Sequence, residues 1–284
     1  MAVHDDLGKR MKEFYEQVPK THLVRRMPVA LRIKGKDFHT FTKGFQKPFD
    51  ELVIKTMQET MKYLCENIQG CVIGYTQSNE ITLILIDYEK LTSIAWLSYE
   101  VQKMCSVAAS MTTFAFNKFF ARNVNEYFEH SPGGISDALL RYNNSLSRAV
   151  EQGAMFDCGC FNIPKEEVTN LVYWRQLDAM HNSVQMVGYV NFSQRELQNK
   201  SCKKIKEMLV TQRGIDWDGL PAYQKQGSCC VRNKIVLGKG GFEITICLRD
   251  TTKTMNAWII DKDIPVFAGE GRGYIERLIY VGEF

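Results

Sequence analysis

Apolar and polar positions alternate with two distinct periods in the first 163 residues. Apolar residues at every second position indicate strands, and apolar residues at helical spacing indicate helices. Ser78 and Asn79 separate two strand-like runs, which is typical of a hairpin. In chain order the pattern predicts a strand (28–34), a helix (48–70), two strands (71–77 and 80–87), a helix (98–123) and a strand (153–163).

The remaining segments predict flanking structure. Residues 7–18 resemble a short amphipathic helix that ends before Pro19, and residues 129–144 resemble a polar loop. From Pro164 to about residue 212 the pattern is helical. Residues 228–284 predict strands joined by two glycine-rich turns, "LGKGGF" (237–242) and "AGEGRGY" (268–274), of which the first is interpreted as a hairpin turn.

The order β-α-β-β-α-β predicts the split arrangement of a ferredoxin-like sheet. We therefore expect an α+β fold, with a palm-like antiparallel sheet and flanking helices over residues 1–163. Residues 164–284 are expected to form a helical and β-hairpin extension packed on that palm.

Composition sets the broad class. The 284 residues are 45% hydrophobic and 24% charged, which is ordinary for a soluble globular protein. No apolar run approaches a membrane span, and the charged N-terminus lacks a signal-peptide core, so we expect a cytoplasmic protein without membrane contact. The nine cysteines are expected to be reduced, and "CGC" (158–160) lacks the usual zinc spacing.

Positive charge concentrates at the N-terminal end. Residues 1–47 hold eleven Lys/Arg and five Asp/Glu, a balance of +6, whereas the whole chain carries +4. A solvated face would explain this excess, and so would an anionic partner such as a triphosphate or a nucleic acid. Charge alone leaves both interpretations open.

The predicted topology brings two polar segments together. In a ferredoxin-like sheet the end of the first strand lies beside the hairpin turn, so residues 34–39 and 77–80 should converge. Palm-type nucleotidyl-transfer enzymes place two carboxylates there to hold two Mg²⁺ ions. The converging residues here are polar but include few carboxylates: Lys34, Gly35, Asp37, His39, Gln77, Ser78, Asn79 and Glu80.

Several ordered motifs resemble the tRNA-His guanylyltransferase family, closest to its bacterial and phage members. They are "LGKRMKEFYE" (7–16), "RMPVALRIKGKDFHTFTKGFQKPFDE" (26–51), "GYTQSNEITLIL" (74–85), "FDCGCFNIP" (156–164) with "YWRQLDAMHNS" (173–183), and "GIDWDGLPAYQKQGSC" (214–229). The resemblance implies a palm-like domain with a C-terminal extension, assembled as a homotetramer. It also implies 3′–5′ addition of a nucleotide to the 5′ end of tRNA, in which ATP activates a 5′-monophosphate and the 3′-hydroxyl of GTP then attacks.

The same resemblance assigns candidate residues. Lys34, Asp37, Asn79 and Glu80 occupy the catalytic region, with Gly35 and Glu80 as remnants of a metal site. The candidate nucleotide-binding residues are Arg32, Gly35, Lys36, Phe38, His39, Lys47 and Ser78. Arg25, Arg26, Arg175 and Asp178 are candidate contacts to tRNA or another RNA 5′ end, although Arg175 and Asp178 could instead form a surface ion pair.

The chain departs from the family at both metal-binding aspartates. Lys34 stands where the first precedes the glycine, and Asn79 stands where the second lies in the hairpin turn. Two carboxylates would carry −2, whereas Lys34 and Asn79 carry +1. Each unit pair at about 4 Å is worth on the order of 4 kcal/mol at an effective dielectric near 20, so the usual two-metal site cannot form.

Four interpretations follow. Asp37, Glu80 or Asp87 could supply substitute ligands and preserve catalysis. Alternatively, the chain could bind a nucleotide or RNA without turnover, with Lys34 replacing part of the electrostatic role of the metal. It could also be a partner subunit of an active paralogue, or carry substitutions engineered to trap a complex.

Overall fold

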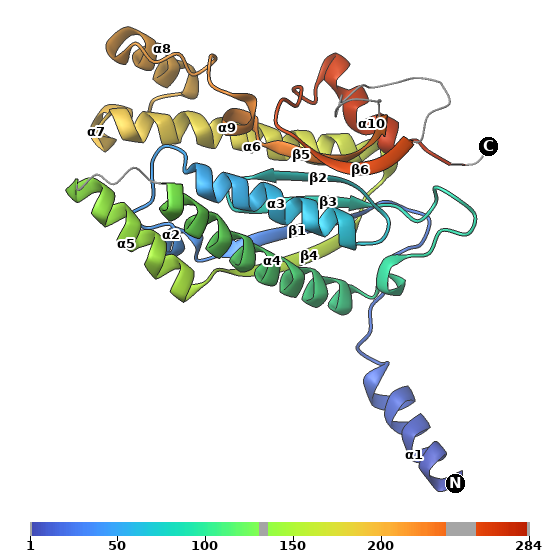
Figure 1. The fold of residues 1–284 in the computed structure, drawn as a ribbon. Helices are drawn as coiled ribbons and strands as arrows, with labels where there is room; N and C mark the ends of the chain where they lie inside the picture. The colour runs from blue at the N-terminus through green and yellow to red at the C-terminus, as the bar shows by residue number, and fades with distance from the viewer. Residues whose placement is uncertain (1, 131–135, 237–253, 283–284) are drawn as a thin grey trace.

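One antiparallel sheet of six strands forms the centre of the computed structural model, which describes residues 2–130, 136–236 and 254–282 (Figure 1). The strand order is β4-β1-β3-β2-β5-β6. The strands are β1 (Val29–Lys36), β2 (Cys71–Gln77), β3 (Glu80–Leu85), β4 (Met155–Asn162), β5 (Ser228–Val236) and β6 (Thr254–Asp261).

The predicted β-α-β-β-α-β order is confirmed by β1, α3 (Glu51–Asn67), β2, β3, α4 (Val101–His130) and β4. The remaining helices are α1 (Ala2–Met11), α2 (Phe38–Phe41), α5 (Asp137–Gln152), α6 (Lys165–Asn191), α7 (Gln194–Leu197), α8 (Cys202–Arg213), α9 (Ala222–Gln226) and α10 (Gly273–Ile279). The α+β class and the ferredoxin-like core are therefore as expected.

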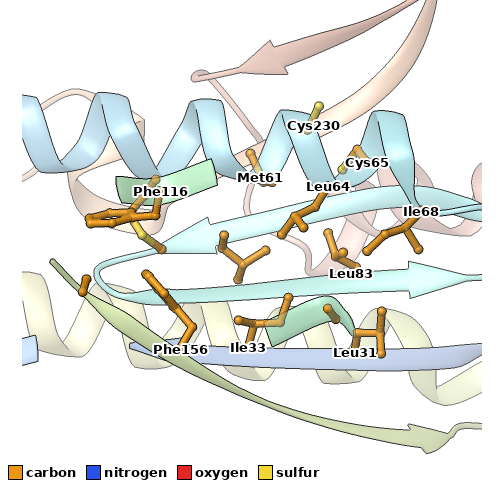
Figure 2. Packing of buried hydrophobic residues seen from close by; sticks show 14 of the residues in the cluster. Leu31, Ile33, Met61, Leu64, Cys65, Ile68, Leu83, Phe116, Phe156 and Cys230 are labelled. Carbon is orange, nitrogen blue, oxygen red and sulfur yellow. The ribbon is translucent and has the colours of Figure 1, made fainter. Parts of the chain in front are cut away.

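Helices cover both faces of the sheet. On one face, Leu31, Ile33 and Leu83 meet Met61 and Leu64 of α3, in a core that α4 completes (Figure 2). The other face lies under α6 and α10, and its core includes residues from both: Val168, Val172, Ile275 and Ile279. Because side chains alternate along a strand, Arg32 and Lys34 lie on the α6 side of β1, opposite Leu31 and Ile33.

A short helical arm lies at the N-terminal end of the described residues. The expected helix over 7–18 starts earlier, with α1 followed by a π-helical turn over Lys12–Glu16, and this arm stands apart from the sheet (Figure 1). Pro19 lies just past its end, as expected. None of the helices in the described ranges is long and apolar enough to cross a membrane.

Two local predictions are wrong. The loop expected over 129–144 is largely helical from Asp137, because Tyr142, Leu146 and Ala149 are buried at helical spacing and Ser136 caps the helix. The segment "AGEGRGY" is a 3-10 turn (Gly269–Arg272) that leads into α10, whose Ile275 and Ile279 are buried. The turn predicted at 237–242 lies outside the described residues.

The C-terminal part shares the sheet of the N-terminal part. β5 pairs with β2 from Ile73↔Val231 to Thr76↔Ser228, and β6 continues beyond β5. The two parts predicted from sequence, residues 1–163 and 164–284, are thus joined by one sheet, and whether each folds alone stays a prediction.

Candidate functional site

The end of β1 lies against the turn between β2 and β3, as the topology predicts. The Gly35 N–H donates to the Asn79 carbonyl at 2.9 Å, and the Asn79 amide Nδ2 donates back to the Gly35 carbonyl at 3.1 Å. Lys34 and Glu80 are partners in the strand register. Ser78 sits in the left-handed region with φ of 50°, which lets the chain reverse in two residues. The turn is thus fastened to β1 by both backbone and side-chain contacts.

Glu80 gathers three cations at this point. Its carboxylate accepts from Arg32 Nε and Nη2 at 3.0 Å each, and Arg175 Nη1 lies 3.4 Å away. Lys34 Nζ is 3.7 Å from the same carboxylate. Asp178 pairs with Arg175 Nη2 at 3.0 Å. Three cations against two carboxylates leave this cluster with one net positive charge.

Arg175 is the buried centre of the cluster. Only 4% of its side chain is exposed, whereas 44% of the Asp178 side chain is exposed. Its guanidinium stacks 3.8 Å from the Trp174 ring, and Arg32 approaches the same ring at 5.3 Å. The ion pair considered for Arg175 and Asp178 is present, but it is not a simple surface pair, because Arg175 is buried and also faces Glu80.

The residues present do not fit two Mg²⁺ ions. The Asn79 amide occupies the Gly35 carbonyl, and the three cations occupy the Glu80 carboxylate. Asp37 is exposed, and across the described ranges no group of three or more His, Cys, Asp or Glu is placed to hold a metal. A divalent cation at the turn would have to displace cations that already neutralise the Glu80 carboxylate.

Asp87 is not a substitute ligand. It follows the far end of β3 from Glu80, about 20 Å away at the rise of an extended strand. Its buried carboxylate accepts from Arg25 Nε at 2.7 Å and from the Arg26 N–H at 2.8 Å. The structure therefore places Arg25 and Arg26 at the opposite end of the sheet from the Gln77–Glu80 turn.

A pocket of about 560 Å³ opens beside the turn. Its walls come from the segment between β1 and α3, from the β2–β3 turn, from α6 and from α9. Of the predicted site residues, Phe38, His39, Lys47, Ser78 and Asn79 line it. Phe38 is also core, since its ring packs 5.1 Å from Phe41 and would collide with any side chain at Gly35.

Sequence reasoning missed the α6 wall. Asn182, Met186 and Tyr189 line the pocket at spacings of four and three, which places them on one side of the helix. Their only sequence signal is that spacing; the exposure of Tyr189, 59%, is known from the structure alone. Tyr223 and Gln224 close the pocket from α9. Six other predicted residues do not line the pocket: Arg32, Lys34, Gly35 and Lys36 of β1, with Asp37 and Glu80.

The comparison with known families decides the identity. A family model described as tRNAHis guanylyltransferase matches residues 8–164, more than half of the chain. The chain belongs to the tRNAHis guanylyltransferase family. It is therefore a guanylyltransferase-like member of the nucleotidyltransferases, as the motifs predicted.

Relatives of this family match most of the chain. A probable tRNA(His) guanylyltransferase of Drosophila melanogaster is 20% identical over 84% of this chain and 80% of its own length. The tRNA(His) guanylyltransferase of Saccharomyces cerevisiae is 24% identical over 74% of this chain and 84% of its own.

Solved structures of the family match more completely. A bacterial tRNA(His) guanylyltransferase (Thg1)-like protein in complex with ATP is 33% identical, with a TM-score of 0.74 over 97% of this chain and all of that chain. A bacterial tRNA(His) guanylyltransferase (Thg1)-like protein in complex with GTP is 32% identical, with a TM-score of 0.73 over 98% of this chain and all of that chain. The palm-like fold of the family is thereby confirmed.

Proposed function

We propose that this family member binds a nucleoside triphosphate, ATP or GTP, in the pocket beside the Gln77–Glu80 turn, and that it does so without divalent metal. The observation that carries this proposal is the cationic cluster around Glu80, at the place where the family resemblance implies a pair of carboxylates. Lys47 and His39 line the pocket, and Lys34 stands next to the turn with 47% of its side chain exposed. An ammonium group is a compact charge suited to a triphosphate.

The base and sugar would occupy the less polar part of the pocket. Phe49, Val53 and Ile54 line one wall, and Met186 and Tyr189 of α6 line another. Ligand pockets combine mostly apolar walls with a few placed polar groups. The bacterial relatives in complex with ATP and GTP support purine triphosphates as the ligand class. The 5′ end of tRNA or of another RNA is the expected macromolecular partner.

A second candidate is catalytic: 3′–5′ addition of GTP to a 5′ end that ATP has activated. The likeness to the bacterial protein over 97% of this chain favours it, since most of the scaffold is retained. The first candidate agrees better with the site, because both oxygens of the Glu80 carboxylate already accept from Arg32, and the Asn79 side chain carries no charge for a metal pair.

Calorimetric titration of ATP and GTP in EDTA and in Mg²⁺ tests the first candidate. We expect dissociation constants that agree within about threefold, because the protein cations replace the metal charge. Binding that requires Mg²⁺ would refute the proposal. Incubation with Mg²⁺, ATP, labelled GTP and a 5′-truncated tRNA tests the second, and one-nucleotide extension would establish it.

Restoring the carboxylates should restore metal dependence. We predict that the double variant Lys34→Asp, Asn79→Asp binds ATP at least tenfold more tightly in Mg²⁺ than in EDTA, because the local charge falls by three units. The same titration measures it, and the tRNA extension assay reports whether addition appears. A Lys43→Asp variant, which changes a lysine outside the predicted site, serves as the charge control. An unchanged metal response in the double variant would contradict this account.

We also propose the homotetramer expected from the family. Light scattering should then give four times the chain mass of 32.7 kDa. A mass equal to that of one chain would contradict it.

A further inference from the structure

Three cysteine thiols meet between α4 and the edge strand β4, away from the nucleotide site. Cys105 lies in the second turn of α4, and Cys158 and Cys160 lie on β4. Cys158 pairs with Ile33 and Cys160 with Leu31 in the strand register. Register partners point to the same face of a sheet, so both thiols face α4. All three cysteines are partly exposed.

The thiols of Cys105 and Cys160 are already in contact. Their Sγ atoms are 3.6 Å apart, and the two residues are separated by 55 positions in sequence. A disulfide needs about 2.05 Å, so the two atoms must approach by only about 1.5 Å, which side-chain rotation can supply. β4 is paired with β1 from Met155 to Asn162, which holds the Cys160 backbone in place.

We propose that Cys105 and Cys160 form a reversible disulfide that joins α4 to β4, made by exchange with a low-molecular-weight disulfide. The Cys105 thiolate attacks one sulfur of that disulfide, forming a mixed disulfide and releasing one small thiol. The Cys160 thiolate then attacks the Cys105 sulfur and releases the second small thiol. Two protein thiols and one small disulfide thus become one protein disulfide and two small thiols, and each protein thiol passes its proton to a departing thiolate.

The surroundings of the thiols set the order of these steps. Burial and then the hydrogen bond with Cys105 raise the pKa of Cys160 to about 12. Burial, followed by the charge of Cys105, also raises the pKa of Cys158. A raised pKa keeps a thiol protonated and slow to attack, which disfavours Cys158 and Cys160 as the first nucleophile.

The other described cysteines do not compete for this bond. Cys65, Cys71, Cys229 and Cys230 are buried, so the folded protein shields them from the reagent. Cys202 is partly exposed on α8, where its Sγ lies 3.2 Å from His181 Nδ1. Within the described residues the polar contacts of Cys202 are to Gln185 and His181 and include no thiol, so exchange there is expected to stop at the mixed disulfide.

Peptide mapping of the full chain after incubation with oxidised glutathione tests the proposal. Native protein is alkylated, digested and analysed by mass spectrometry. We expect a peptide linked through Cys105 and Cys160 that is absent after reduction, absent in Cys105→Ser and Cys160→Ser, and retained in Cys158→Ser. A link between Cys105 and Cys158, or mixed disulfides alone, would overturn the proposal.

The melting temperature gives an independent test, which begins with the unmutated protein. Closing a loop of this length restricts the unfolded chain, so we expect the oxidised protein to melt on the order of 5 °C higher than the reduced protein. The Cys202→Ser variant should show the same rise, whereas Cys160→Ser should show none. An equal or lower melting temperature after cross-linking would overturn the claim that the bond fits the folded state.

The proposal is separable from nucleotide binding. Leu31 and Ile33 place the thiols on the α4 side of the sheet, whereas Arg32 and Lys34 face α6. ATP affinity in EDTA is therefore expected to stay within about twofold on oxidation. A loss of ATP affinity on cross-linking would overturn this placement. Failure of ATP binding in both redox states would contradict the nucleotide proposal and leave the disulfide proposal unaffected.

Discussion

Glu80 shows how one side chain can set the electrostatics of a site. It is the only carboxylate within 4 Å of Arg32, Lys34 and Arg175 together in the described part of the chain. Without it, three positive charges would stand within a few ångströms of one another, and the buried Arg175 guanidinium would keep only Asp178 as an acidic partner. The carboxylate therefore stabilises the fold and at the same time weakens the attraction of the cluster for anions.

We predict opposite effects of Glu80→Gln on stability and on anion binding. Removing one member of a largely buried ion cluster should cost about 2–4 kcal/mol in the free energy of unfolding. Because the cluster becomes more positive, ATP affinity in EDTA should rise several-fold. Urea denaturation and calorimetry measure the two quantities. Glu207→Gln, which removes a surface pair with Lys204, should change both by little. Weaker ATP binding in Glu80→Gln would contradict this assignment.

The residue contacts that sequence could predict are those where the end of β1 meets the β2–β3 turn. The ferredoxin-like topology brings residues 34–39 beside residues 77–80, and in the structure Lys34 pairs with Glu80. The contact of Glu80 with Arg175 depends on how α6 crosses β3, which no local pattern encodes. Asp87 is separated from Glu80 by the whole of β3. The rise of that strand alone excludes Asp87 as a metal ligand at the turn.

At the scale of elements, Asp50 joins three segments. Its carboxylate caps α3 by accepting from the Leu52 and Val53 N–H groups, and it also accepts from the Gln46 N–H and the Tyr142 hydroxyl. Tyr142 belongs to α5, so this one residue links the start of α3 to a helix about 90 positions later. Burial, and then the Asp50 charge, raise the pKa of Tyr142, which keeps its hydroxyl a donor.

We predict that Asp50→Ala lowers the free energy of unfolding by about 2–4 kcal/mol, because it leaves buried donors without an acceptor. Ser136→Ala removes the exposed cap of α5 and should cost only about 1 kcal/mol. Urea denaturation of both variants gives the comparison. Equal losses would show that the contacts of Asp50 beyond the cap add nothing.

The element boundaries that were wrong have a common cause. In α5 and α10 the polar or glycine-rich composition masks two or three buried apolar residues at helical spacing. Those residues become informative only when the surface that buries them is known, namely the aromatic cluster beneath α5 and the α6 side of the sheet beneath α10. The long elements α3, α4 and α6 carry enough turns for their period to be read from sequence alone.

At the scale of the molecule, the two predicted parts depend on each other. The face of the sheet that carries Ala30, Ile73 and Ile84 is covered by α6 and α10, which both lie after residue 163. β5 also pairs along β2, so removing it would leave β2 as an open edge. An apolar sheet face and an unpaired edge are both aggregation hazards.

We predict that a fragment of residues 1–163 does not fold as an independent domain. Expressed alone, it should show a broad thermal transition and lower solubility than the full chain, because one face of its sheet is uncovered. Circular dichroism and light scattering measure this, with the full chain as reference. Recovery of a sharp transition on co-expression with residues 164–284 would support the explanation. A sharp transition for the fragment alone would show that the two parts are separate domains.

The strand order also has a consequence during synthesis. β1 lies between β3 and β4, and its partners on β4 run from Met155 to Asn162, more than a hundred residues later in the chain. At a translation rate of about 5–20 residues per second, β1 waits on the order of 6–25 seconds on the ribosome before its second neighbour exists. During that interval its row of Val29, Leu31 and Ile33 has only the β3 hairpin and the two long helices for protection. The free edge of β1 is therefore most exposed to pairing with a wrong strand until β4 has been synthesised.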